Sequence, residues 1–327
     1  MKTTSTFILS ITLIVLSGMS AHGQDMSSIP GAFVDVGYGD RPVAMGNAYV
    51  GLADDVNAVY LNPAGLSFLK APQIQFTHTK LMGLVDYNFV TAAVPFKGNQ
   101  AVGVTFINSG DDLMREISGH LAYSIHVGQV SAGIAGKFRY SSFGNNTLLE
   151  SDYSGIFDPD EITTGLSNQV TGDGSGYGLD LSALYKATEN LTFGVMVRDV
   201  IAPFSWSSEV ANTEAQTKGD YTEDVPFELL VGSSYQTGKS TFSVELRPST
   251  DNEQDDAIRF GFERVFFNVL AARLGTEQWL NNMDDDKYMA GVGLNIPKMA
   301  GVSIRFNYSY VVDSLANTQR VGVQLHF

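Results

Sequence analysis

Apolar and polar residues alternate with a period of two along most of the chain. In one segment Val302, Ile304 and Phe306 alternate with Ser303 and Arg305. This is the period of a β-strand, in which successive side chains point to opposite faces of the sheet. The alternation recurs in fourteen segments, near 74–80, 85–96, 100–108, 116–127, 129–141, 176–187, 191–200, 226–236, 240–247, 258–266, 269–275, 288–296, 302–312 and 320–327. Their lengths suit tilted strands that cross a bilayer.

The connections between these segments differ in length in a regular way. Connections after even-numbered segments are short, such as residues 97–99 and 188–190. All the long ones, near 142–175, 201–225, 248–257 and 276–287, follow odd-numbered segments. Outer-membrane barrels have short turns at the periplasmic end and longer loops at the external end. The pattern therefore predicts an all-β fold, a transmembrane antiparallel β-barrel of about 14 strands in the bacterial outer membrane.

The four long connections also carry the negative charge of the chain. They contain 19 acidic and 2 basic residues, a formal charge of −17, whereas the whole chain carries −15. Acidic side chains keep exposed loops hydrated and apart. We expect these acidic loops to face the outside of the cell.

Charged residues within the predicted strands occupy positions opposite the apolar series. A basic residue on the lipid face would cost roughly 2–4 kcal/mol at the membrane midplane. We therefore expect the charges to face the lumen, either as ion pairs or as a polar lining that tunes passage. The candidates are Lys137, Arg139, Asp180, Arg198, Glu228, Glu245, Arg259, Glu263, Arg273 and Arg305.

The chain before residue 74 lacks the alternation. Lys2 precedes an apolar run from Phe7 to Leu16, and Ala21-His22-Gly23 has the small-x-small pattern of a cleavage site. We predict a secretory signal peptide at 1–23. Because fourteen strands enclose more space than side chains alone can fill, the lumen is either plugged or a pore. We predict that 24–73 is a hatch inside the barrel and that 74–327 forms the wall.

Short helices are expected in the hatch. Pro42 lies where a helix would begin. Asp54 and Asp55 are expected to cap a second helix that runs through Tyr60, and Asn62-Pro63 would end it. We expect Asn62 to hydrogen-bond the hatch to the wall, with Pro63 as the helix stop.

One motif in the hatch carries a family resemblance. It comprises AMGNAYVGLADD at residues 44–55 and VYLNPAGL at 59–66, and so includes Asp54, Asp55, Asn62, Pro63, Ala64 and Gly65. The motif resembles the N-terminal signature of the PorV/PorQ family and of the related FadL/OmpP1-type long-chain fatty-acid transporters. The resemblance implies a fourteen-stranded barrel whose N-terminal segment forms the hatch.

The resemblance leaves two functions open, of which we predict the first and keep the second as the alternative; a structural outer-membrane protein without a transport role is a third hypothesis. A FadL-like protein would let small hydrophobic molecules cross the outer membrane. A PorV/PorQ-type protein would serve type IX secretion, with secreted cargo or the translocon as its partner. In both cases outer-membrane lipid surrounds the barrel.

Composition argues against several other classes. The chain has no cysteine, which excludes disulfides and thiolate metal sites. A nucleic-acid partner is not expected, because the acidic chain lacks a basic surface for phosphates. No G-x-S-x-G or H-E-x-x-H motif occurs, so we expect neither an enzyme nor a catalytic residue, and no cofactor or metal.

Overall fold

We describe the fold from a computed structural model, which covers residues 38–327 apart from 82, 84, 112–113, 145–169, 211–217, 251–255, 281–285, 300 and 315. The predicted signal peptide, the first part of the hatch and most of the acidic loops lie outside the described residues. No helix of the described part is long and apolar enough to span a bilayer.

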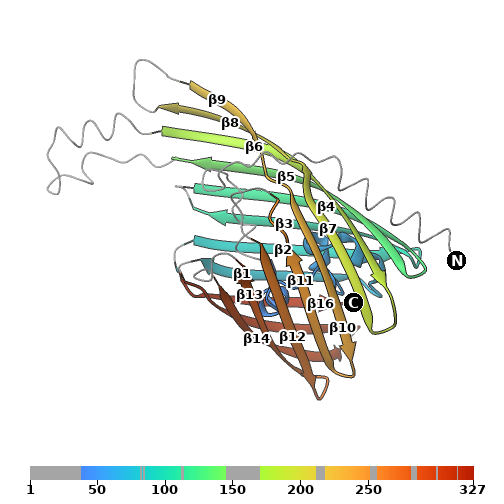
Figure 1. Cartoon of the computed structure of the whole chain (residues 1–327). Helices are drawn as coiled ribbons and strands as arrows, with labels where there is room; N and C mark the ends of the chain where they lie inside the picture. Colours follow the sequence, from blue (N-terminus) through green and yellow to red (C-terminus); the bar gives the residue numbers. More distant parts are fainter. Residues whose placement is uncertain are drawn as a thin grey trace.

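The wall is a single antiparallel sheet that closes on itself (Figure 1). Neighbouring strands pair in sequence order, β1 pairs with β16, and β7 pairs with β10. The strands are β1 (Gln73–Leu81), β2 (Val85–Phe96), β3 (Gln100–Gly110), β4 (Met114–Val127), β5 (Val130–Phe143), β6 (Val170–Lys186), β7 (Leu191–Ile201), β8 (Pro203–Val210), β9 (Lys218–Asp224), β10 (Glu228–Thr237), β11 (Ser240–Arg247), β12 (Ala257–Phe266), β13 (Leu270–Trp279), β14 (Lys287–Met299), β15 (Val302–Val312) and β16 (Thr318–His326).

Sixteen strand segments form a barrel of fourteen strands. β8 continues β7 beyond Ala202, and β9 leads into β10 through 225–227. The long strand β6 pairs with β7 along one half and with β8 along the other. The predicted closed barrel of about fourteen strands is therefore confirmed.

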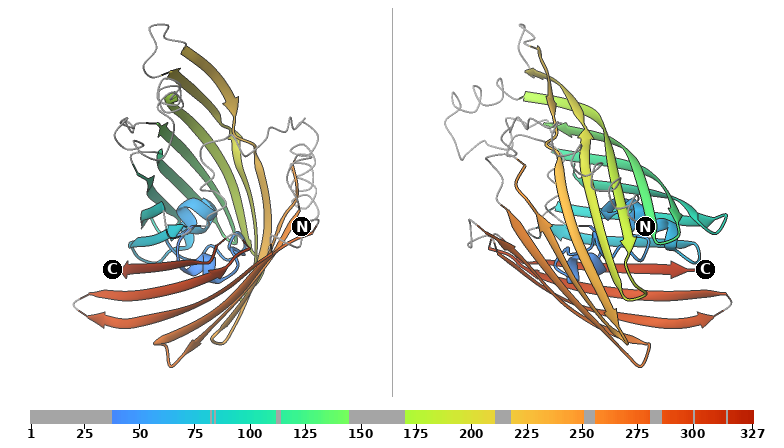
Figure 2. Two further views of the ribbon diagram at one scale, coloured as in Figure 1. Left: turned by 90° about the vertical axis from the view of Figure 1, so that its left-hand side faces the viewer. Right: turned by 45° about the vertical axis from the view of Figure 1, so that its right-hand side comes forward.

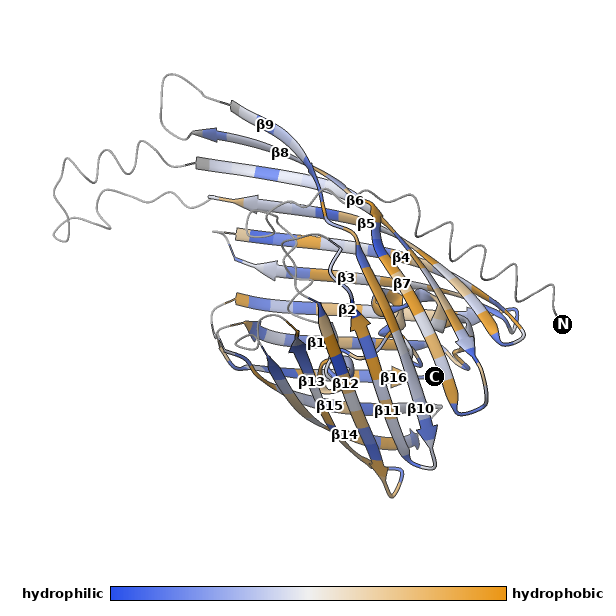
Figure 3. Cartoon of the chain, in the orientation of Figure 1, coloured by the Kyte–Doolittle hydropathy of each residue, from blue (hydrophilic) through white to orange (hydrophobic). Residues whose placement is uncertain are grey.

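The two faces of the wall differ as the alternation predicts. Outward side chains such as Leu121 (64% exposed) and Phe138 (56% exposed) are apolar, whereas their strand neighbours Ser118, Lys137 and Arg139 are buried inside. Figure 3 shows the resulting change between apolar and polar residues along β11 and β12. An apolar exterior and a polar interior are the arrangement that a bilayer requires of a barrel.

One predicted loop was wrong. Residues 201–225 contain the two strands β8 and β9, which project with β6 beyond the rest of the wall (Figures 1 and 2). Along β8 the aromatic side chains Phe204 and Trp206 are buried, while Ser205 and Ser207 are exposed. The polarity is therefore opposite to that of the lipid-facing strands. A search for outward apolar residues cannot find such a strand.

The described part of the hatch lies within the curve of the sheet (Figure 2). It contains α2 (Arg41–Ala44), α3 (Ala58–Leu61) and the 3₁₀ helix η3 (Pro63–Phe68). Almost every residue from Tyr38 to Leu66 is buried, including Met45, Tyr49 and Val59. Since η3 packs on β4 and β5 and α2 on β14 and β15, the hatch joins opposite parts of the wall.

Candidate functional site

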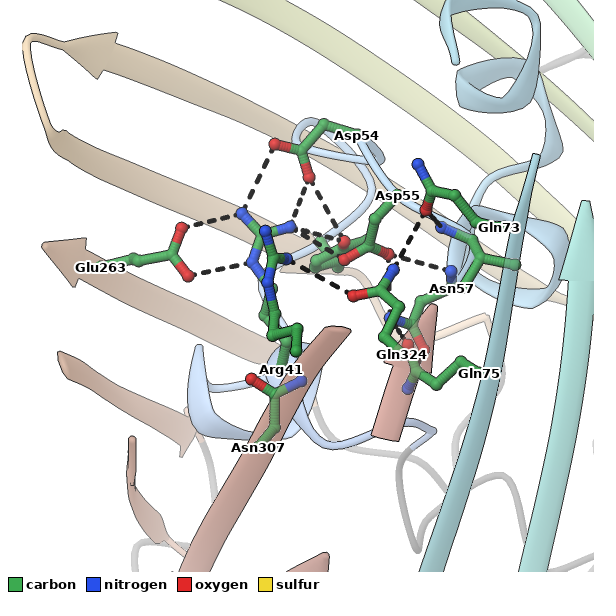
Figure 4. A network of polar contacts seen from close by, with 12 residues as sticks. Arg41, Asp54, Asp55, Asn57, Gln73, Gln75, Glu263, Asn307 and Gln324 are labelled. Carbon is green, nitrogen blue, oxygen red and sulfur yellow. Dashed lines mark hydrogen bonds and ion pairs between the residues drawn. The ribbon is translucent and has the colours of Figure 1, made fainter. Parts of the chain in front are cut away.

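Arg41 occupies the centre of the contact between hatch and wall (Figure 4). Its guanidinium forms two hydrogen bonds with the Glu263 carboxylate of β12, at 2.9 and 3.0 Å. On the hatch side it pairs with Asp54 and, at 3.0 Å, with Asp55. The planar fork of arginine suits this bidentate recognition of carboxylates. Arg41 thus holds two parts of the hatch and one wall strand together.

Asp55 extends the network away from Arg41. Its Oδ1 accepts hydrogen bonds from the backbone and side-chain nitrogens of Asn57, and Asn57 in turn bonds Gln75 of β1 at 3.0 Å. Burial alone would raise the pKa of Asp55, but the Arg41 guanidinium holds that pKa below its ordinary value. Asp40, which caps α2 through its side chain, has its pKa raised to about 6 by burial despite the opposing Arg273.

A second connection runs through Glu245 of β11. One oxygen of its carboxylate accepts the backbone N–H groups of Tyr49 and Val50, at 3.0 and 2.8 Å. The other oxygen accepts from Arg259 at 2.8 Å. Glu245 is 1% exposed, so the pairing with Arg259 offsets the cost of burying its charge. This contact fixes the turn between α2 and α3 against the wall.

The remaining motif residues hold the second half of the hatch. The prediction that Asn62 bonds the wall was wrong: its Nδ2 donates to Val50 O at 2.7 Å, and its Oδ1 accepts from Ala64 N, both within the hatch. The wall contact belongs instead to Ala64, whose N–H also donates to Ser182 Oγ of β6 at 3.0 Å. Pro63 begins η3, and the Gly65 N–H bonds Asn62 O at 2.9 Å.

The second hatch helix also differs from the prediction. We expected Asp54 and Asp55 to cap a helix through Tyr60, but α3 begins at Ala58 with Asn57 at its N-cap. Asp54 and Asp55 point to Arg41, because pairing with a buried guanidinium stabilises them more than a helix N-terminus would.

The predicted lumen charges fall into neighbouring clusters. Lys137 contacts Asp180 and Asp199 at 2.7 and 2.8 Å, and Arg139 contacts Asp199 at 2.9 Å. Nine of the ten predicted residues are buried. The other contacts are Arg198 and Arg247 with Glu228, Arg259 with Glu245 and Glu277, and Arg273 with Glu263. The tenth, Arg305, is partly exposed and bonds Asn295 Oδ1 at 2.6 Å.

Several members of these clusters were missed from sequence. Arg41 was the main one, although an arginine among small residues ahead of two adjacent aspartates was a usable signal. Asp199 was overlooked because the pairing of β6 and β7 is interrupted by a bulge, where Asp199 has a positive φ of 56°. The bulge turns the Asp199 side chain inward, which the alternation along β7 does not predict. Within the described residues, no group of three or more His, Asp or Glu is placed to hold a metal ion.

A closed fourteen-stranded barrel with an apolar exterior is typical of an outer-membrane β-barrel, and here a segment of the same chain is packed in the bore. Solved structures share the fold. The CymD monoaromatic hydrocarbon channel aligns with a TM-score of 0.58 at 13% identity, over 89% of this chain and 97% of that chain. The toluene transporter TbuX of Ralstonia pickettii gives 0.56 at 14% identity, over 89% and 97%. A FadL homologue of Pseudomonas aeruginosa gives 0.57 at 13% identity, over 88% and 98%.

The family is identified by sequence. The model of the type IX secretion system membrane protein family PorP/SprF matches residues 55–325, and the chain belongs to that family. The predicted resemblance to a protein family of type IX secretion is therefore confirmed. The matching family is PorP/SprF, and the more specific assignment to PorV/PorQ is not confirmed. No curated protein sequence matches the chain.

Proposed function

We propose that this protein is a sealed outer-membrane platform of type IX secretion, which receives secreted cargo or the translocon at the long-loop end of the barrel. The observation that carries the proposal is the occupied bore: the hatch is clamped to β11 by Glu245 and to β12 through Arg41. A protein that docks a partner at its rim needs no open channel. Membership of the PorP/SprF family supports the same role.

The projecting sheet supplies a docking surface for such a partner. At about 3.3 Å per residue, the 17 residues of β6 span roughly 56 Å along the strand. At the ~35–45° tilt of strands in outer-membrane barrels this is about 40–45 Å along the membrane normal, which exceeds a lipid-facing apolar band of ~25 Å. The projection is polar on its outer face and carries Asp220 and Asp224 on β9. In this proposal the projection and the acidic loops face the cell exterior.

Passage of small hydrophobic molecules is the second candidate. Two proteins of the same fold, CymD and TbuX, are a monoaromatic hydrocarbon channel and a toluene transporter, which favours passage by analogy. The bore described above is lined by buried ion pairs, and a void beside Tyr38 and Thr77 measures only about 10 Å³. Such a void holds at most one water molecule. We therefore rank passage behind secretion.

A deletion strain separates the two candidates. We expect deletion to abolish surface attachment of a reporter fused to the C-terminal domain of a secreted cargo, and the wild-type gene to restore it. Uptake of toluene by the same cells serves as the parallel measurement and should remain unchanged. Normal reporter attachment in the deletion strain would refute the secretion role, and a loss of toluene uptake alone would favour passage.

A further inference from the structure

The outer face of the wall has a hollow between β10 and β13. Its volume is about 530 Å³. Aromatic side chains form its sides: Tyr235, Phe242 and Phe260 are each close to half exposed. Its floor includes the smaller Ser233 and Thr276. The strand register places Phe260 opposite Thr276, so both side chains lie on the lipid-facing side.

The hollow lies in a membrane-facing surface, which decides what fills it. Leu246 and Leu274 beside it are 47% and 60% exposed, as lipid-facing residues of the apolar belt are. Of the two polar side chains on its floor, Thr276 is already hydrogen-bonded, because its Oγ1 donates to Lys287 O and accepts from Gln278. The hollow therefore offers dispersion contacts and apolar burial, which suit a hydrocarbon chain.

A cation lies at one end of the hollow. Arg264 follows Phe262 by two residues on the same face of β12, and it is exposed. Its Nη1 donates to Ser240 Oγ at 3.1 Å, and its guanidinium lies 5.6 Å from the Phe266 ring centroid. Arg264 is near the short turn at 267–269, where an outward basic residue costs only about 0–1 kcal/mol because it reaches the membrane interface.

We propose that the hollow and Arg264 together bind one anionic glycerophospholipid. One of its two acyl chains lies between the aromatic side chains, and its phosphate accepts hydrogen bonds from the Arg264 guanidinium. An apolar trough that ends in a cation matches both parts of such a lipid. The same strands seat the hatch on their inner side, where Gly46 packs against the backbone of Phe260 and Thr276. In this proposal the bound lipid stabilises the part of the wall that contacts the hatch on its inner side.

Native mass spectrometry of the full-length barrel, delipidated and then titrated with phosphatidylglycerol, tests the proposal. We expect one tightly retained phosphatidylglycerol, and no comparable retention of a diacylglycerol with the same chains. Arg264→Gln should lower retention at least about tenfold, since hydrogen bonds to a charged group are lost. Thr276→Phe and Ser233→Leu, which fill the hollow, should lower it with Arg264 intact.

Two matched variants serve as controls. Lys298→Gln removes an exposed cation at the same end of the wall on β14, and Ala132→Leu enlarges an exposed lipid-facing residue on β5. Both should bind like the wild type, and the heat-dependent gel shift of a folded barrel shows that each variant is folded. Equal losses in Arg264→Gln and Lys298→Gln would overturn the proposal. It would also fail if the hollow-filling variants bound normally, or if a co-purified protein, and no lipid, occupied the hollow.

Discussion

At the residue scale, Arg41 joins parts of the chain that are far apart in sequence. It contacts Asp54, Asp55 and Glu263, and all but Asp54 are almost fully buried. Removing one partner of a buried ion pair leaves an uncompensated charge, which costs about 3–5 kcal/mol. Arg41→Gln should therefore lower the unfolding free energy by about that amount in urea titrations of the barrel in detergent micelles.

The exposed pair Lys80–Asp86 provides the control for this prediction. Both side chains are 51% exposed and lie 3.6 Å apart. Lys80→Gln should change the unfolding free energy by no more than about 1 kcal/mol, because exposed pairs contribute little. Equal effects of the two substitutions would mean that Arg41 does not hold the hatch.

Close backbone contact between hatch and wall gives a second prediction. A Cβ on Gly275 would overlap the backbone nitrogen of Gly46, which itself adopts a positive φ of 66°. Gly275→Val should displace the hatch from its contact with β13. Because the hatch fills the bore, we expect higher ion conductance in planar bilayers. Gly119→Val is the matched variant, because a Cβ there meets no atom within 4 Å. Conductance that stays equal in both variants would contradict this seating of the hatch.

The sequence predicted residue roles unevenly. The side of the wall on which a charge lies follows from its position in an alternating strand, so Lys137 and Glu245 were placed on the inner face. Which partner each charge contacts depends on strand register and on the path of the hatch, neither of which a local pattern contains. Asn62 shows this limit: its amide was expected at the wall but caps η3 and bonds Val50 within the hatch.

At the element scale, the strands that face lipid could be predicted from the sequence, whereas those beyond the membrane could not. Strands within the membrane were recognised because hydrocarbon imposes an apolar residue at every second position. β8 and β9 lie beyond that constraint and bury Phe204 and Trp206 on the inner face, so they were predicted as a loop. The hatch helices are short, and Asn57, the N-cap residue of α3, makes no side-chain capping bond that a motif would reveal.

The projecting hairpin can be removed without opening the barrel. β9 pairs with β8, and β8 pairs with β6, whereas β7 and β10 pair directly below them. Replacing residues 204–223 by Asn-Gly should therefore leave a folded, heat-modifiable barrel. We expect this variant to lose surface attachment of the cargo reporter in the deletion strain. Full rescue would show that cargo docks elsewhere.

At the scale of the whole molecule, the wall separates two environments. Apolar side chains face lipid, and the bore holds ion pairs that connect the wall with the hatch. This division accounts for a chain with only 17% charged residues, since much of its surface meets hydrocarbon. It also explains why the class of fold could be predicted while the choice between secretion and passage could not. Both functions require the same exterior, and they differ in what happens at the rim and in the bore.

The position of the membrane along this wall can be tested with a single charge. Leu121 lies in the middle of β4 and is 64% exposed, whereas Ser205 is an exposed outward residue of β8 in the projection. Leu121→Arg should lower the unfolding free energy in phospholipid vesicles by about 2–4 kcal/mol, because it places a cation in the hydrocarbon. Ser205→Arg should change it by less than about 0.5 kcal/mol, as is usual for a surface exposed to water. If Ser205→Arg were the more destabilising of the two, the projection would lie in the membrane and could not be the docking surface.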